Sequence, residues 1–141
     1  MRVAIVYDTH TGTTAGAAEQ MAAVVRSAGH DCTVTNISNA EARDVAAAGA
    51  VVLGAWTKGW FVIKQHPSEP MMSYIDGLSL NGKRVAVFAT YKLAAGGTLR
   101  HLASAAESAG GKVTGMYKVK GPNVPDGFEA WVASLASKTA V

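Results

Sequence analysis

Residues 3–14 read VAIVYDTHTGTT, a short apolar run followed directly by a turn that is rich in threonine. The run Val3–Tyr7 contains β-branched residues and no charge, as buried strands do. From Ala15 to Ala28, apolar residues recur at spacings of three and four, which indicates a helix, and Gly29 is a typical helix stop. The chain therefore begins with a predicted strand, a polar turn and a helix.

The same alternation of strand and helix continues along the chain. Further strands are predicted at Cys32–Ile37, Ala50–Ala55, Arg84–Ala89 and Lys112–Val119. A second helix is predicted from Ser38 to Gly49, because a Ser-x-x-Glu capping box occurs at Ser38. Further helices are predicted at Ser68–Asp76, Thr98–Ala109 and Asp126–Ser137. The last of these has Trp131 on its core-facing side. Strict alternation implies a parallel sheet with helices on both faces. Five such units suit a doubly wound α/β sheet of strand order 2-1-3-4-5, whose ligand crevice lies outside the carboxyl ends of the first and third strands.

Length and composition fit one soluble domain covering residues 1–141. Apolar residues make up 49% of the chain, enough to bury a core, yet no window approaches the roughly 18 consecutive apolar residues of a membrane helix. The first residues do not resemble a signal peptide, so a cytoplasmic protein without membrane insertion is expected. Cys32 is the only cysteine, which excludes a disulfide scaffold and predicts a small core residue.

The charge balance is mildly basic. A net charge of +3 and a pI near 9.1 arise from 13 basic residues scattered along the chain. This bias favours acidic partners or anionic ligands. Nucleic-acid binding is not expected, because no basic cluster with interleaved aromatic residues occurs. The four histidines do not group with acids or cysteine at metal-ligand spacing, so no metal site is predicted.

The turn after the first predicted strand has the chemistry of a phosphate site. It combines Gly12 with four hydroxyls at a helix N-terminus, from Thr9, Thr11, Thr13 and Thr14. Side-chain donors, backbone N–H groups and the positive end of a helix dipole together suit a phosphate. An ordinary turn would need only one threonine as a helix cap.

Two further loops are predicted to meet this turn at the same edge of the sheet. After the third strand, Trp56 and Trp60 flank Thr57, Lys58 and Gly59, which predicts an exposed aromatic surface, unless one indole folds back over a neighbouring helix. After the fourth strand, Thr90-Tyr91-Lys92 leads to Gly96-Gly97. Tyr91 offers a second aromatic face, and the glycines allow backbone amides close to a planar ligand, or simply give a flexible entry to the next helix.

These three loops, with Leu80–Phe88, resemble the phosphate loop, aromatic loop and Leu-x-Gly-Lys-x-Val-Ala-Val-Phe strand of flavodoxins. The short, uninterrupted fifth strand resembles the short-chain type. The resemblance implies a flavodoxin-like fold and one non-covalent FMN. It assigns the FMN phosphate to Thr9, His10, Thr11, Gly12, Thr13 and Thr14. It places the flavin ring between Trp56 and Tyr91, with its edge lined by Thr57, Lys58, Gly59, Trp60, Thr90, Lys92 and Gly96.

The function implied by this resemblance is electron transfer between redox partner proteins, a reductase and an acceptor, with no catalytic residue. Flavodoxins are usually acidic, whereas this chain places Lys58, Lys64, His66 and Lys92 in the candidate loops. Partners with acidic surfaces are therefore expected. A lysine about 5 Å from the flavin would stabilise negative charge gained on reduction by roughly 3 kcal/mol, on the order of 0.1 V, which predicts a less reducing couple.

Several alternatives remain open at this point. The Rossmann pattern is absent, since the first loop has a single glycine and the second strand ends near Asn36. A receiver domain would match Asp8, Thr90 and Lys118 or Lys120, but Trp56 stands where its phosphate-accepting aspartate belongs. The cobalamin-binding motif Asp-x-His-x-x-Gly matches Asp8 and His10 but meets Thr13 where it needs glycine.

Two alternatives lie within the flavodoxin superfamily itself. One is an FMN-dependent oxidoreductase of quinone-reductase or protoporphyrinogen-oxidising type, in which residues 60–65 shape a substrate pocket. The other is a flavodoxin-like domain that has lost FMN, which the basic loops would favour.

Overall fold

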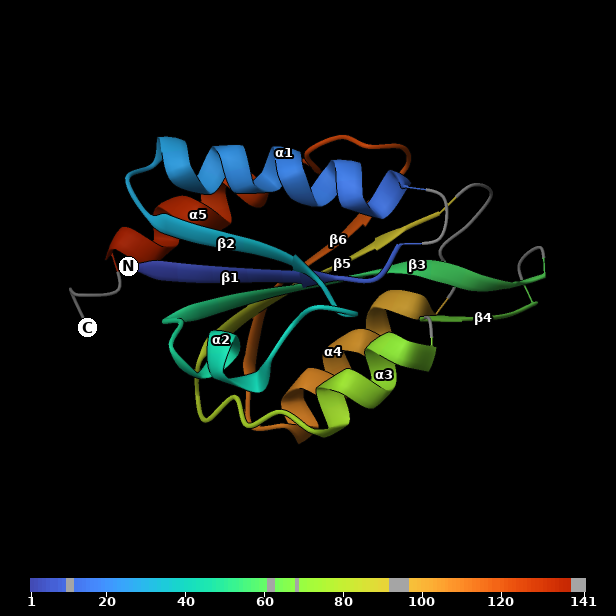
Figure 1. The fold of residues 1–141 in the computed structure, drawn as a ribbon. Coiled ribbons are helices and arrows are strands. Elements are labelled where there is room, and N and C mark those ends of the chain that lie inside the picture. The colour runs from blue at the N-terminus through green and yellow to red at the C-terminus, as the bar shows by residue number, and fades with distance from the viewer. Residues whose placement is uncertain (10–11, 61–62, 68, 92–96, 138–141) are drawn as a thin grey trace.

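A parallel sheet lies between two layers of helices in the computed structural model (Figure 1). The structure describes residues 1–9, 12–60, 63–67, 69–91 and 97–137, and at residues 42, 58–60, 63–67 and 136–137 it describes the backbone alone. Helices α1 and α5 cover one face of the sheet, and α2, α3 and α4 cover the other.

The sheet has the predicted doubly wound topology. Its parallel strands are arranged in the order β2-β1-β3-β5-β6, which is 2-1-3-4-5 when the parallel strands are counted along the chain. The strand bounds are β1 Arg2–Tyr7, β2 Asp31–Asn36, β3 Ala50–Trp60, β5 Arg84–Thr90 and β6 Lys112–Val119. The α/β fold class predicted from the alternation of elements is confirmed, and β6 has the predicted bounds at both ends.

The third strand is longer than its sequence pattern predicted. Instead of ending at Ala55, β3 continues to Trp60 and pairs with an antiparallel strand, β4, at Ile63–Pro67. Thr57 lies opposite Pro67, and Trp60 opposite Ile63. The prediction of a loop from Trp56 to Trp60 was therefore wrong. Tryptophan and threonine favour extended backbone, and β4 provides the pairing partner that a local pattern does not reveal.

The helices are α1 Thr13–Ser27, α2 Ala42–Ala46, α3 Glu69–Asp76, α4 Thr98–Ser108 and α5 Phe128–Ser137. The predicted capping box at Ser38 was wrong. Asn36 Oδ1 accepts a hydrogen bond from the Ser38 backbone N–H at 3.1 Å, which holds a turn there. The helix starts one turn later, where Asp44 Oδ2 accepts from the Glu41 backbone N–H at 3.2 Å.

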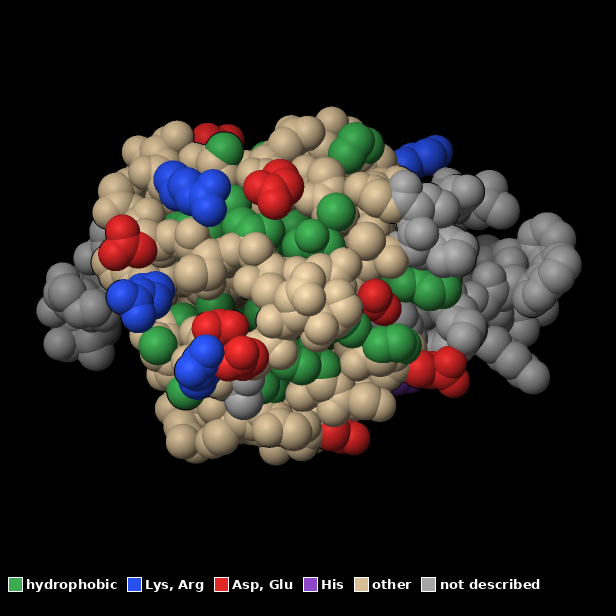
Figure 2. All heavy atoms as spheres, in the orientation of Figure 1, with side chains coloured by type: hydrophobic (Ala, Val, Ile, Leu, Met, Phe, Trp, Pro, Cys, Tyr) green, Lys and Arg blue, Asp and Glu red, His purple; other side chains and the backbone are tan. Residues whose placement is uncertain are grey.

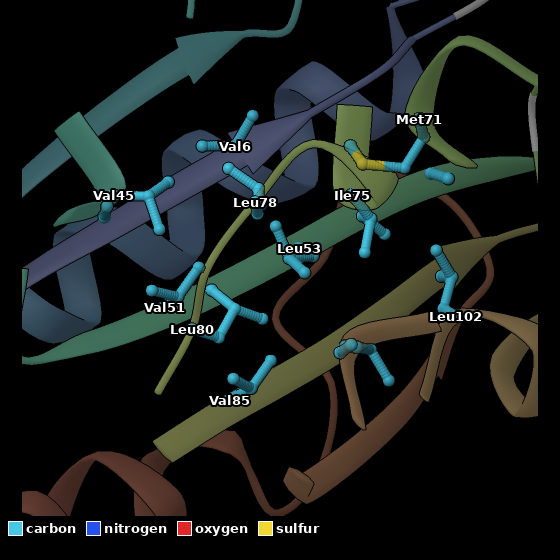
Figure 3. Close-up of a cluster of buried hydrophobic side chains, with 14 of the residues drawn as sticks. Val6, Val45, Val51, Leu53, Met71, Ile75, Leu78, Leu80, Val85 and Leu102 are labelled. Carbon is cyan, nitrogen blue, oxygen red and sulfur yellow. The ribbon is translucent and has the colours of Figure 1, made fainter. Parts of the chain in front are cut away.

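The core has two parts, one on each face of the sheet. On one face, Val6, Leu53 and Val85 from three adjacent strands lie in one buried cluster with Ile75 of α3 and Leu102 of α4 (Figure 3). On the other face, Trp131 of α5 is 4% exposed, stacks on Phe128 with ring centroids 5.8 Å apart, and donates from Nε1 to Thr114 Oγ1 at 2.7 Å. The predicted packing role of Trp131 is confirmed.

Cys32 lies on the edge strand β2 and is half-buried against the α1 side of the core. Burial raises the pKa of its thiol to about 11, so the neutral thiol prevails at physiological pH. The sequence predicted a small core residue, whereas the structure places Cys32 at the margin of the core, packed against it but not fully buried.

The surface over β2, α1 and α2 carries both acidic and basic side chains, with apolar side chains between them (Figure 2). This matches a charge bias that is spread along the sequence. Among the helices that the structure describes, none is both long and apolar enough to cross a bilayer.

Gly54 of β3 lies opposite Phe88 of the neighbouring strand β5. A Cβ added there would lie 2.1 Å from the ring of Phe88, which is fully buried. We expect Gly54→Ala to lower the free energy of unfolding by about 1–3 kcal/mol, because Phe88 has no free space into which it can move. Urea unfolding measures this. Gly77→Ala is the control, since its Cβ would meet only Tyr74 O at 3.7 Å and should be near neutral. Equal effects would contradict the packing argument.

Candidate functional site

The carboxyl ends of β1, β3 and β5 bring the predicted loops to one edge of the sheet. The Asp8 backbone N–H donates to Gly54 O at 2.9 Å, which joins the end of β1 to β3. In the next strand pair, Trp56 lies opposite Thr90. The Tyr91 backbone N–H then donates to Val119 O at 3.2 Å. The edge at which the sequence predicted a ligand crevice is thus the edge at which these loops meet.

The first loop surrounds the N-terminus of α1. Gly12 is the N-cap and has a φ of +92°, a conformation that glycine adopts without strain, and a Cβ there would meet no atom within 4 Å. Thr9 Oγ1 accepts hydrogen bonds from the backbone N–H groups of Gly12 at 3.0 Å and Ala15 at 3.4 Å. The first turn of α1 contains no acidic residue. The loop therefore brings the Thr9 hydroxyl and the N–H groups of Gly12 and Ala15 together at the positive end of a helix, a position that suits a phosphate.

Thr14 and Thr90 form a buried hydroxyl pair. Their Oγ1 atoms lie 2.6 Å apart, and the two side chains are 1% and 3% exposed. In this arrangement the Thr14 hydroxyl faces the end of β5. The pair links the first turn of α1 to the strand that leads into Tyr91, so it joins two of the three predicted loops directly.

Trp56 is held by an acidic residue of the first loop. Its indole Nε1 donates to Asp8 Oδ2 at 3.3 Å, and the contact is partly buried. Trp56 itself is half-buried, so its side chain is neither fully exposed to solvent nor fully buried in the core. Sequence reasoning did not include Asp8 among the cofactor residues. No local signal could have shown this role, because the two residues are 48 positions apart.

Two further hydroxyls bear on whether a ligand fits this edge. Thr57 Oγ1 and Thr98 Oγ1 are buried and make no hydrogen bond to any residue that the structure describes. Thr57 adjoins Trp56, and Thr98 is the first residue of α4, after the loop that follows β5. A buried hydroxyl without a partner costs about 1–3 kcal/mol, which a ligand with polar atoms can recover. With the first loop, these groups fit a phosphate-bearing, polar, planar ligand such as FMN.

Several predicted site residues lie outside the residues that the structure describes: His10, Thr11, Lys92 and Gly96. For Lys58, Gly59 and Trp60 the backbone is placed in β3. The described site residues Thr9, Gly12, Thr13, Thr14, Trp56, Thr57, Thr90 and Tyr91 all lie at the carboxyl edge.

A doubly wound parallel sheet with a glycine-capped, threonine-rich loop after its first strand is typical of open-sheet α/β proteins that hold a phosphate group at this edge. The family model for flavodoxin matches residues 5–134. The chain belongs to the flavodoxin family.

Solved structures show the same fold at low sequence identity. A flavodoxin from the domain Archaea is 19% identical, with a TM-score of 0.75 over 96% of this chain and 93% of that one. Fusobacterium nucleatum flavodoxin bound to flavin mononucleotide is 15% identical, with a TM-score of 0.71 over 97% and 98%. Rubredoxin oxygen:oxidoreductase from Desulfovibrio gigas is 23% identical, with a TM-score of 0.72 over 99% of this chain and 35% of that one. A comparison with curated proteins gives no match.

The hydroxyl pair makes a prediction about stability. Thr90→Val leaves the buried Thr14 hydroxyl without its partner, and we expect a loss of about 1–3 kcal/mol in the free energy of unfolding. Thr14→Val should have a similar effect. The double variant should cost clearly less than the sum of the two, because no polar group is then stranded. Urea unfolding of the wild type, the two single variants and the double variant measures these free energies in a double-mutant cycle. Additive effects would show that the two hydroxyls do not interact.

Proposed function

We propose that this protein binds one FMN without a covalent bond and transfers electrons between redox partner proteins. The observation that carries the proposal is the first loop. Thr9, Gly12 and Ala15 direct hydrogen-bonding groups toward the N-terminus of α1, where a family member would hold a phosphate monoester.

The residues that would hold FMN follow from the family and from their places at the carboxyl edge. The phosphate is assigned to Thr9, His10, Thr11, Gly12, Thr13 and Thr14. Trp56 and Tyr91 are assigned to the two faces of the ring. The ring edge is assigned to Thr57, Lys58, Gly59, Trp60, Thr90, Lys92 and Gly96. The Thr57 hydroxyl, which has no partner among the residues that the structure describes, supports this assignment, because a bound ring would supply an acceptor or donor.

FMN when bound supplies the redox chemistry, so the chain needs neither a nucleophile nor an acid–base pair. The role of the protein is to bind the cofactor and to orient it. The Thr9 hydroxyl and the α1 amides fix the phosphate end, and the Thr14–Thr90 pair sets the distance between this end and the Tyr91 loop. Partly buried Trp56 limits the access of water on one side.

An FMN-dependent oxidoreductase is the second candidate. The similarity to rubredoxin oxygen:oxidoreductase favours it, since this fold occupies about a third of that redox enzyme. The β3–β4 hairpin also extends beyond the end of the sheet beside the site (Figure 1), where it could border a substrate. Turnover of a quinone with a nicotinamide donor, without a second protein, would favour the enzyme over the carrier.

The partners proposed for the carrier are a reductase and an acceptor with acidic surfaces, because the chain has a net charge of +3. A cytoplasmic location remains a prediction from the sequence.

FMN titration is the first test. We expect absorption bands near 370 and 450 nm in purified protein and quenching of FMN fluorescence with one-to-one stoichiometry when apoprotein is titrated. Thr9→Ala should weaken FMN binding at least tenfold, because it removes the hydroxyl at the centre of the loop. Thr33→Ala, on strand β2 and away from the site, is the control. A colourless protein that leaves FMN fluorescence unchanged would support a domain that has lost its cofactor.

The basic loops make a prediction about potential. Neutralising Lys58 and Lys92 with Lys→Gln substitutions should lower the flavin midpoint potential, by on the order of 0.1 V for each lysine that lies about 5 Å from the ring. Lys112→Gln, at the amino end of β6, should leave the potential unchanged. Spectroelectrochemical titration measures both. Unchanged or higher potentials in the loop variants would refute the electrostatic argument.

A further inference from the structure

We propose that Asp8 is a positioning residue for Trp56 and that its charge lowers the preference of the site for phosphorylated over unphosphorylated flavin. This inference rests on the proposed function. Asp8 lies at the edge of the loop assigned to the phosphate, yet its side chain is acidic, and a negative charge repels a phosphate.

The position of Asp8 is fixed by the sheet. The backbone N–H of Asp8 donates to Gly54 O at 2.9 Å, and the preceding Tyr7 O accepts from the Ile37 backbone N–H at 2.9 Å. The end of β1 is thereby held by both neighbouring strands. The side chain extends from this fixed backbone to the Trp56 indole, with Nε1 and Oδ2 3.3 Å apart. A partly buried indole N–H needs an acceptor, and Asp8 provides it.

Asp8 also adjoins, along the chain, the loop that is assigned to the phosphate. Asp8 directly precedes Thr9, whose hydroxyl accepts from Gly12 and Ala15 at the start of α1. Because the first turn of α1 contains no acidic residue, Asp8 adds a negative charge to a region to which this turn contributes none. A fixed negative charge here opposes a phosphate dianion but has little effect on a flavin without phosphate. The contact with Trp56 and the charge therefore have separable consequences.

Asp8→Asn separates them. The amide oxygen of asparagine can still accept from Trp56 Nε1, while the charge is lost. We expect the dissociation constant of FMN to fall about threefold to tenfold at low ionic strength, with the difference shrinking in high salt. The dissociation constant of riboflavin, which lacks the phosphate, should change less than twofold.

Asp8→Ala removes the acceptor as well as the charge. We expect Asp8→Ala to bind riboflavin at least threefold more weakly than Asp8→Asn does, because the Trp56 indole loses its hydrogen bond to residue 8. The second readout is the indole N–H resonance of Trp56 in cofactor-free protein, identified by its absence in Trp56→Phe. It should stay near its wild-type position in Asp8→Asn and shift in Asp8→Ala.

Asp31→Asn is the matched control. Asp31 is an exposed aspartate at the amino end of β2, opposite Arg2 in the strand register and at the far end of the sheet from the loops. Its neutralisation removes the same charge from the molecule and should leave the binding of both flavins unchanged.

The outcomes distinguish this inference from the proposed function. Equal changes for FMN and riboflavin in Asp8→Asn, or an equal gain in Asp31→Asn, would overturn the charge argument. A Trp56 resonance that is unmoved in Asp8→Ala would overturn the positioning role. If wild-type protein binds neither flavin, the proposed function fails, while the resonance measurement still decides whether Asp8 orients Trp56.

Discussion

The burial of β1, β3 and β5 on both faces is the constraint on which the structure depends. Val3 and Ile5 face one helix layer, Ala4 and Val6 face the other, and all four are at most 1% exposed. Strands of this kind need helices on both sides, so the chain must cross over alternately above and below the sheet. Crossovers to opposite faces diverge between β1 and β3, and the divergence leaves an opening at their carboxyl ends. The place of the site thus follows from the packing of the core.

Contacts between loops then convert this opening into a specific site. Each loop is tied to a neighbour: Asp8 to Trp56 through the indole, and Thr14 to Thr90 through paired hydroxyls. Because these polar groups are partly or fully buried, each contact is favourable only when both partners are in place. The loop at the N-terminus of α1 and the ends of β3 and β5 are therefore positioned together.

The burial of the strands on both faces also explains why proteins of low sequence identity to this chain share its fold. Structures only 15–23% identical to this chain reach TM-scores of 0.71 to 0.75. A doubly wound sheet requires apolar residues at the right periods, and many combinations meet that need. The site is less permissive, because charge and hydrogen bonding depend on individual side chains.

Periodicity in the sequence determined the fold class, since apolar runs and helical spacing are local properties. It predicted β6 at both ends, the sheet order, and the loops that meet at the carboxyl edge. It failed at Trp56–Trp60, where pairing with β4 extends the strand, and at Ser38, where Asn36 holds a turn. Only the tertiary structure decided that Asp8 meets Trp56 and that Thr14 meets Thr90, residues 48 and 76 positions apart. Such contacts depend on how individual side chains of distant segments meet in space, and no local pattern encodes these pairings.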